Sequence, residues 1–416
     1  MKRAVPSALS VMGLLLLATL VAACGHTPTG NSSGHGLRWE SFYGASNTPS
    51  TFITGIVSGN LWYNNCTRKV EMYYPVYHPL KHDNDILWFW NGSQWRSIKT
   101  VLTFTPSQID GQYFAWDSND CRIIMLDSPF TDSLAAADLP GQVLSPTWMF
   151  NGKSWNIATP ASPGIAMGIV MVYDPSTRTI VLNGKMYYPA KQSGTWPVPK
   201  GNARQVVQQI NRMGLESIKR PYHPLSFSTT TNTWIFNGRT WIEEHLDNGP
   251  PVVNGFSAVY DEGHLAVYDP ATRTVVLFGG GTNPMLVNAQ STRKPGAPLF
   301  VESKPVYDTW LWNGVTWTKA DVKDNPQVDT TYSAMAYDPL LKGVVLYDTQ
   351  SRTTWLWTGN DWERLRTTNT MSPKARVYPL MVFDVSTGQL ILVGGDPQGS
   401  HPHRFHHTWV LAGIMH

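Results

Sequence analysis

The sequence has little charge, few cysteines and one main apolar run. Only 15% of its 416 residues are charged, and the formal net charge is +3. So small a positive excess excludes the concentrated basic surface that is typical of nucleic-acid-binding proteins. The apolar run, residues 11–21, is shorter than the ~20 residues that a transmembrane helix needs. Hydrophobic residues still make up 42% of the chain, enough to bury a large core.

A short phrase of aromatic residues, Asn-Gly, two further residues and Trp recurs along the chain. Its first copy reads Trp88-Phe89-Trp90-Asn91-Gly92-Ser93-Gln94-Trp95. Asn-Gly accepts the positive φ angles of a two-residue turn, and the flanking residues favour strands, so each copy predicts a β-hairpin. Further copies end at Trp155, Trp241, Trp317 and Trp362.

A second phrase precedes the first in each unit. Residues 266–280 contain a strand, a turn begun by Asp269-Pro270, and a second apolar strand. Two hairpins together make a four-stranded antiparallel unit, so the chain is a series of such units. Other copies cover residues 171–182, 335–347 and 381–395, and a looser one covers 113–126.

This order of strands and turns resembles the Kelch repeat, whose second strand ends in Gly-Gly and whose fourth strand carries Trp. The Gly-Gly pair is present at Gly279-Gly280 and Gly394-Gly395, and the Trp positions are more regular. The resemblance covers about residues 37–413. It implies an all-β fold, a divergent Kelch-like β-propeller similar to the central domain of galactose oxidase. Such propellers serve both as binding platforms and as enzymes, so the resemblance leaves function open.

The repeats predict six blades, with the last one completed from the other end of the chain. Only three residues follow Gly413, too few for a fourth strand, whereas Gly36-Leu37-Arg38-Trp39 fits the fourth-strand phrase. We therefore expect the N-terminal strand to complete the last blade and close the ring. The third-strand residues that define the blades are Trp88, Trp148, Trp234, Trp310, Trp355 and Trp409.

The first residues resemble a bacterial lipoprotein signal. Lys2 and Arg3 precede the apolar run, and Val21-Ala22-Ala23-Cys24 follows it. This predicts a signal peptide over residues 1–23, lipid on Cys24 and a flexible Gly- and Ser-rich tether over 24–36. We expect an extracytoplasmic monomer anchored by lipid to a bacterial membrane. The alternative is an ordinary secretion signal.

The two remaining cysteines lie in equivalent turns of neighbouring units. Cys66 and Cys121 both fall between a first and a second strand, on the same rim of the ring. In an oxidising compartment this placement predicts a disulfide. The alternative is two free thiols.

The connections predict two different faces. Turns between first and second strands, and between third and fourth strands, are short; they form what we call the tight-turn face. The remaining connections form the long-loop face, which carries insertions at about 183–232, 281–306 and 396–407. Long loops on a rigid scaffold commonly carry function. The first insertion contains a predicted short helix from Asn202 to Gly214.

Amphipathic side chains on the long-loop face are the candidate ligand-binding residues. Tyr, Trp and His combine an apolar body with a polar tip, which suits sugars and peptides. The alternative is that the repeated Tyr-His-Pro-Leu segments pack the loops and that Trp196 pins its insertion. The candidates are Trp196, Tyr77, His78, Tyr222, His223, His401 and His403.

Metal binding is an alternative role for the histidines of the last long loop. Neutral imidazole is a good ligand for zinc, copper or nickel. Spacing along the chain does not show that the side chains converge, so we expect no resident metal or other cofactor. The metal candidates are His401, His403, His406 and His407.

We expect a surface-tethered binding module for a glycan, peptide or protein ligand rather than an enzyme. The alternative is a carbohydrate-active propeller enzyme of mutarotase, oxidase or hydrolase type, assisted by a metal on the loop histidines. The oxidase would need a cysteine crosslinked to tyrosine beside copper, but the cysteines lie on the other face. Asn313-Gly314-Val315-Thr316-Trp317 lacks the Ser and Asp of a sialidase Asp-box, and no catalytic pair stands out among the loop carboxylates. These carboxylates are Glu243, Glu244, Asp247, Glu302, Asp329 and Asp396.

Overall fold

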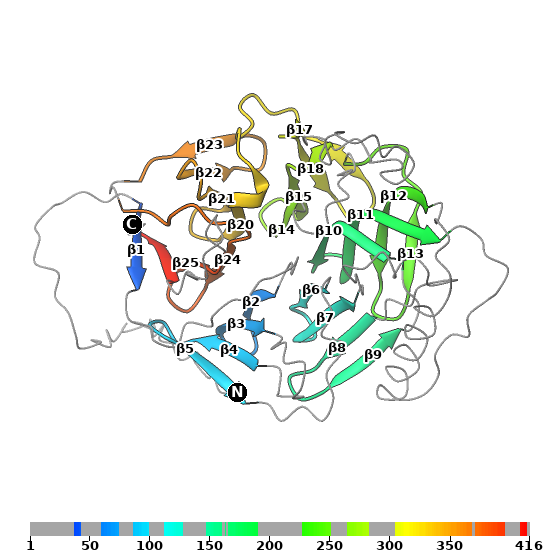
Figure 1. The fold of residues 1–416 in the computed structure, drawn as a ribbon, viewed down its shortest axis with the longest axis horizontal. Helices are drawn as coiled ribbons and strands as arrows, with labels where there is room; N and C mark the ends of the chain where they lie inside the picture. The colour runs from blue at the N-terminus through cyan, green and yellow to red at the C-terminus, as the bar shows by residue number, and fades with distance from the viewer. Residues whose placement is uncertain are drawn as a thin grey trace, which may run out of the picture. The chain divides into compact units, whose positions relative to one another are not determined.

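The protein is a six-bladed β-propeller of antiparallel four-stranded sheets (Figure 1). The computed structural model describes residues 37–42, 60–74, 86–99, 112–127, 147–159, 163, 165–189, 227–250, 264–282, 304–367, 371–395 and 408–413. These residues belong to one compact unit, Gly36–His416. The predicted fold class is confirmed.

The first three blades follow one another along the chain, each with its strands in sequence order. Blade 1 is β2 (Leu61–Asn64), β3 (Lys69–Tyr74), β4 (Ile86–Trp90) and β5 (Trp95–Lys99). Blade 2 is β6 (Gln112–Asp117), β7 (Arg122–Asp127), β8 (Thr147–Phe150) and β9 (Trp155–Thr159). Blade 3 is β10 (Ile165–Asp174), β11 (Thr179–Pro189), β12 (Phe227–Phe236) and β13 (Trp241–Glu244).

The last three blades include the strand that closes the ring. Blade 4 is β14 (Leu265–Asp269), β15 (Thr274–Phe278), β18 (Thr309–Trp312) and β19 (Trp317–Lys319), with a small hairpin of β16 (Gly281–Thr282) and β17 (Lys304–Pro305). Blade 5 is β20 (Ser333–Asp338), β21 (Gly343–Asp348), β22 (Thr353–Trp357) and β23 (Trp362–Leu365), preceded by the 3-10 helix η2 (Thr330–Tyr332). Blade 6 is β24 (Leu380–Asp384), β25 (Gln389–Val393), β26 (Thr408–Ala412) and β1 (Arg38–Phe42).

Ring closure by the N-terminal strand is confirmed. β1 pairs antiparallel with β26, with Arg38 opposite Ala412 and Phe42 opposite Thr408. Trp39 is only 1% exposed, and its ring lies 4.4 Å from that of Tyr347 in blade 5. The strand therefore occupies the outer position of blade 6 and packs against the neighbouring blade.

Second strands carry continuous apolar runs because both faces of a blade are covered. Every residue of β21 is buried, and Leu390 to Val393 of β25 are fully buried as well. Each blade packs its faces against two neighbours, so alternation of apolar and polar residues is lost in the middle strands. First strands instead lie at sheet edges around the centre, where β6 contacts β10, β10 contacts β14, β14 contacts β20, β20 contacts β24 and β24 contacts β2 (Figure 1).

Neighbouring blades are also joined by a repeated hydrogen bond. The indole Nε1 of Trp241 in blade 3 donates to the Thr147 hydroxyl of blade 2 at 2.7 Å. The indole of Trp317 donates in the same way to Thr233 at 2.9 Å. Both partners are buried, so the fourth-strand Trp is a joint between blades as well as a core residue. The same bond joins Trp362 to Thr309 and Trp95 to Thr408.

The Asn-Gly turns differ from the prediction in one respect. Trp90 pairs with Trp95, so the connection has four residues rather than two. Gly92 takes a positive φ of 94°, but Asn91 does not take one. Instead its side-chain oxygen accepts hydrogen bonds from the N–H groups of Ser93 and Gln94, at 3.0 and 2.8 Å. Asn is therefore needed for its side chain, and only Gly for its backbone freedom.

The long-loop face is less uniform than expected. The insertion at 183–232 begins and ends as a ribbon, because β11 and β12 stay paired as far as Pro189 and Phe227. In blade 5 the second-to-third connection is short, with only residues 349–352 between β21 and β22. The helix predicted from Asn202 to Gly214 lies outside the described residues.

Candidate functional site

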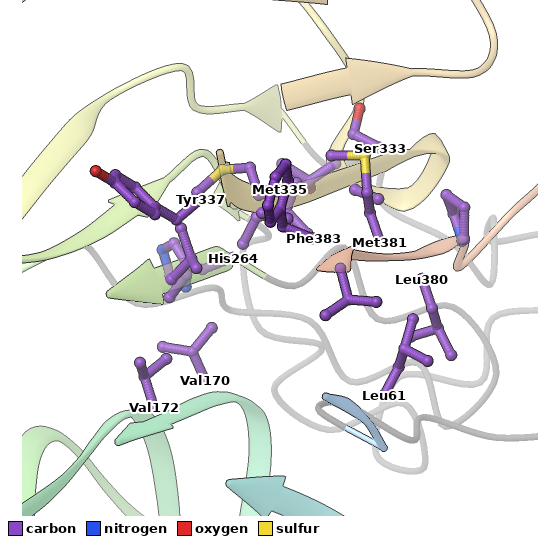
Figure 2. Close-up of a pocket in the computed structure, with 18 of the residues that line it drawn as sticks. Leu61, Val170, Val172, His264, Ser333, Met335, Tyr337, Leu380, Met381 and Phe383 are labelled. Atoms are coloured by element: carbon purple, nitrogen blue, oxygen red, sulfur yellow. The ribbon is translucent and has the colours of Figure 1, made fainter. Parts of the chain in front are cut away.

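A cavity of about 580 Å³ lies among the first strands of the propeller. Among the described residues, five blades contribute to its wall, through β2, β10, β14, β20 and β24 (Figure 2). Repetition accounts for this convergence, because each blade places the same edge strand toward the centre. Its volume falls in the range of small-molecule binding sites.

The wall of the cavity is mainly aliphatic and contains methionine and one phenylalanine. Figure 2 shows Val170 and Val172 of β10 on one side, and Met335, Met381 and Phe383 on the other. None of the described lining residues carries a carboxylate, an ammonium or a guanidinium group. Small side chains at Ala266, Ala334 and Ala336 leave the space open.

Polar side chains gather at the long-loop end of the cavity. His264 precedes β14 and is 6% exposed, and Ser333 begins β20. The Ser333 hydroxyl donates to the carbonyl of Asp329 at 2.8 Å, and the Asp329 carboxylate accepts from the Thr331 N–H at 2.8 Å. Asp329 thus caps η2 and sets the direction of the chain that enters β20.

Tyr378, also at this end, has a strained backbone. Its φ is 54°, in the left-handed region that a bulky residue rarely adopts. The Tyr378 N–H donates to the Thr331 carbonyl at 2.7 Å, and Pro379 follows in the chain. This bond ties the entrance of blade 6 to that of blade 5 and holds the strained conformation. Such outliers often mark functional positions.

A buried arginine supports the same region from behind. Arg376 is 1% exposed, and its guanidinium donates to the carbonyls of Lys374 and Gly394 at 3.0 and 3.1 Å. Gly395 has a φ of 83°, and a Cβ there would lie 2.9 Å from the arginine side chain, so glycine is required. Burial lowers the pKa of Arg376 to about 10, so the group stays cationic at neutral pH.

At the tight-turn end the cavity is bordered by Tyr63 and Tyr337. Burial raises the pKa of Tyr337, and the nearby charges of Asp269 and Asp338 raise it further. Burial likewise raises the pKa of Asp338, whose carboxylate accepts from two turn N–H groups. The Asp338 carboxylate is thus occupied in holding the turn at the end of the strand, and Tyr337 stays protonated at neutral pH.

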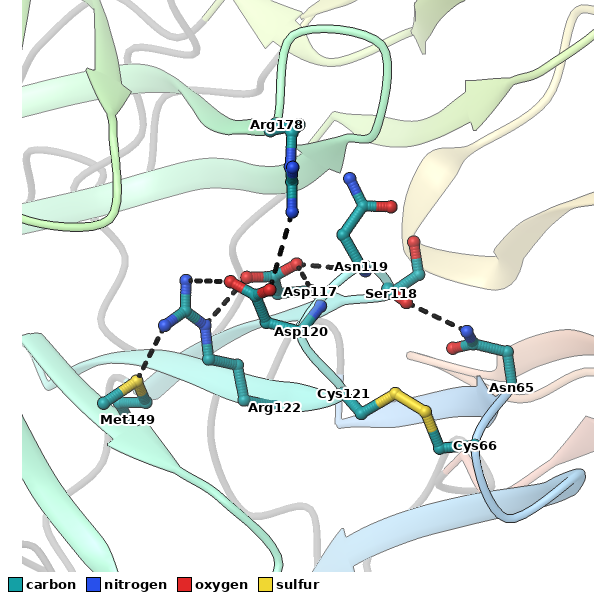
Figure 3. Close-up of polar contacts among 10 residues, drawn as sticks. All are labelled: Asn65, Cys66, Asp117, Ser118, Asn119, Asp120, Cys121, Arg122, Met149 and Arg178. Atoms are coloured by element: carbon teal, nitrogen blue, oxygen red, sulfur yellow. Dashed lines mark hydrogen bonds and ion pairs between the residues drawn. A yellow bond between two sulfur atoms is a disulfide. The ribbon is translucent and has the colours of Figure 1, made fainter.

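The predicted disulfide between Cys66 and Cys121 is confirmed on the tight-turn face (Figure 3). Its Cα atoms are 6.2 Å apart, and it links the first turns of blades 1 and 2. Beside it, the Arg122 guanidinium binds Asp117 at 2.8 Å and Asp120 at 2.9 Å. Asp120 also lies 3.6 Å from Arg178 of blade 3, so blades 1, 2 and 3 are joined in succession.

The predicted ligand residues Trp196, Tyr77, His78, Tyr222 and His223 lie outside the described residues. So do Cys24, His401, His403, His406 and His407, and the carboxylates Glu302 and Asp396. Within the described part of the chain, no group of three His, Cys, Asp or Glu side chains could hold a metal ion. No helix there is long and apolar enough to cross a membrane.

Sequence reasoning missed His264, Ser333 and Tyr378. All three lie at or next to the start of a first strand, in the connections between blades. The sequence prediction rested on the longest insertions, whereas these residues adjoin the first strands on the same face. A positive φ at tyrosine has no sequence signal.

The described fold and cavity define a six-bladed β-propeller with an apolar centre. No protein-family model matches the chain, and no curated protein matches its sequence. The structure of YjhT is 13% identical, with 88% of this chain and 94% of that chain covered and a TM-score of 0.46. A GH93 α-L-arabinofuranosidase of Fusarium graminearum, solved with arabinobiose, is 10% identical over 85% and 93%, with a TM-score of 0.46. An auxiliary nutrient binding protein from Bacteroides thetaiotaomicron is 8% identical over 86% and 69%, with a TM-score of 0.39. Similarity at this level concerns the fold alone.

Proposed function

We propose that this protein is a binding module that takes up an apolar segment of a peptide ligand in its central cavity, which the ligand enters from the long-loop end. The observation that carries the proposal is the wall, which is mainly aliphatic and has no charged side chain among the described lining residues. His264, Ser333 and Tyr378 lie at its long-loop end, and Tyr63 and Tyr337 lie at the other end. Such a wall favours apolar side chains of a ligand, while the polar groups can form hydrogen bonds with its backbone or hydroxyl groups and so orient it.

The strand edges favour a peptide over a glycan. Each first strand is the edge of its sheet, so backbone N–H and C=O groups face the centre next to the apolar side chains. An extended peptide can use both features, because edge strands offer hydrogen bonds and the wall accepts side chains. A glycoside hydrolase, one form of the carbohydrate-enzyme alternative, would need a pair of carboxylates, and the described lining residues supply none.

The sequence supports an extracytoplasmic location for this module, with a lipid anchor to the membrane. The lipoprotein signal ending at Cys24 and the Kelch-like order of strands stay predictions.

Selection of displayed peptides on the purified full-length protein would test the proposal. Val172 points into the cavity, so Val172→Phe should fill part of it and weaken the selected peptides by tenfold or more (Figure 2). Val315→Phe is the matched control, because Val315 is 73% exposed in a turn on the tight-turn face. Both variants should melt close to wild type.

Two outcomes would reject the cavity as the site. One is equal affinity of the selected peptides for wild type and Val172→Phe. The other is protection from hydrogen exchange that falls on the Asn-Gly turns rather than on β10, β20 and β24. Zinc or copper titration of His401→Ala and His403→Ala would test the metal alternative separately.

A further inference from the structure

The tight-turn face carries a repeated set of exposed cations. In four blades the residue that precedes the second strand is Arg68, Arg178, Arg273 or Lys342, and all four are exposed. Each takes a left-handed φ, between 55° and 59°. In blade 6 the corresponding residue is Gly388, for which a positive φ is unstrained. Long basic side chains thus recur at a position where a Cβ is disfavoured.

The turns between third and fourth strands add cations to the same face. Lys153 and Arg239 are exposed in the Asn-Gly turns of blades 2 and 3. Contacts show that both kinds of turn share one surface. A Cβ on Gly314, in the Asn-Gly turn of blade 4, would lie 2.7 Å from Thr177 in the first turn of blade 3.

Carboxylates of this face lie mostly below the cations. Asp174, Asp269 and Asp338 are buried, and each accepts a hydrogen bond from an N–H of its own turn. The exposed Asp120 is paired with Arg122 and Arg178. A flat surface that approaches from outside therefore meets guanidinium and ammonium groups first.

The N-terminal strand joins the propeller on this face. Leu411 of β26 lies opposite Leu390, which is beside the tight turn of blade 6. On its other side Leu411 pairs with Trp39 of β1, and the next pair toward the turn is Arg38 with Ala412. β1 consequently begins beside the tight turn of blade 6, and Leu37 just before it forms an isolated bridge with Thr367, which follows β23 of blade 5.

We propose that the tight-turn face docks on an anionic phospholipid surface, so that the long-loop face and the cavity mouth point away from the membrane. Charge complementarity and the start of β1 beside the tight turn of blade 6 support the same orientation. The orientation relies on the proposed lipid anchor, whereas the affinity of the face for anionic lipid does not.

Sedimentation with lipid vesicles tests the face without the anchor. The chain from Gly36 to His416, which forms one compact unit and lacks both the apolar run and Cys24, should bind phosphatidylcholine vesicles that contain phosphatidylglycerol, and not pure phosphatidylcholine. Added salt should release it. In this background Arg273→Gln should weaken binding about fivefold, the usual effect of one basic residue near an anionic surface. Combination with Lys153→Gln and Arg239→Gln should abolish it.

Arg352→Gln is the matched control. Arg352 is an exposed arginine with a φ of 58°, but it lies in the short turn of blade 5 on the long-loop face. Its substitution should leave binding unchanged. Equal loss with Arg352→Gln, or no preference for phosphatidylglycerol, would overturn the proposed docking face. Mass spectrometry of the Cys24 chain tests the lipid anchor independently.

Energy transfer to a headgroup-labelled lipid then tests the orientation of the anchored protein. A dye on Lys153→Cys should transfer more strongly than one on Gln350→Cys, which lies in the short turn that contains Arg352. Equal transfer, or stronger transfer from position 350, would contradict the orientation.

Discussion

At the residue scale, the bond between a fourth-strand Trp and the Thr of the preceding blade is the clearest recurring device. Thr147→Val keeps the shape of the side chain but leaves the buried indole of Trp241 without its acceptor. We expect a loss of about 1–3 kcal/mol in the free energy of unfolding, measured by denaturant titration. Substitution of the exposed Thr240 by Val should cost far less.

Blade 1 lacks the threonine of this bond and so allows the converse experiment. Leu87 stands where four other blades have the bonded Thr, and among the described residues the indole of Trp155 has no hydrogen-bond partner. In Leu87→Thr the new hydroxyl can accept a hydrogen bond from the Trp155 indole. This bond should offset part of the stability that is lost when the buried leucine side chain is removed. Leu87→Thr should therefore destabilise less than Leu277→Thr, a change at a fully buried leucine of blade 4. Equal losses in the two variants would contradict this reading.

Tyr378 offers a second residue-scale prediction. Asparagine tolerates a left-handed backbone better than tyrosine, so Tyr378→Asn should change the free energy of unfolding by no more than about 1 kcal/mol. The same variant should weaken peptides selected on the wild-type cavity. A loss of stability above about 2 kcal/mol, with unchanged binding, would show that Tyr378 is a packing residue only.

At the element scale, one short strand holds the ring closed. Trp39→Ala removes a 1%-exposed indole from its place beside Tyr347 and should cost about 3–5 kcal/mol. Removal of residues 37–41 should lower the melting temperature further, because it also leaves β26 as an open edge. Calorimetry would measure both, with exposed Arg38→Ala as the control. An unchanged melting curve for the deletion would contradict the observed closure.

At the scale of the whole molecule, a covalent link between blades 1 and 2 complements the noncovalent closure of blade 6. The disulfide spans 55 residues of sequence. Chain entropy predicts a stabilisation of about 4 kcal/mol for a loop of this length, as an upper value. The double variant Cys66→Ser, Cys121→Ser should lose a large part of this in chemical unfolding. Reductant should destabilise the wild type and leave the double variant unaffected.

The sequence by itself determined the repeat, the number of blades, the closing strand and the disulfide pair. These follow from turn chemistry and strand periodicity, which act over a few residues and recur with each blade. The tertiary structure alone decided the central cavity, because Val170, Ala336 and Met381 are far apart in sequence and meet only when the ring closes. It also decided the strained backbone of Tyr378, which no side-chain pattern encodes. The end of blade 6 at which β1 begins likewise depends on the register of β1 against β26, a long-range pairing within the last blade.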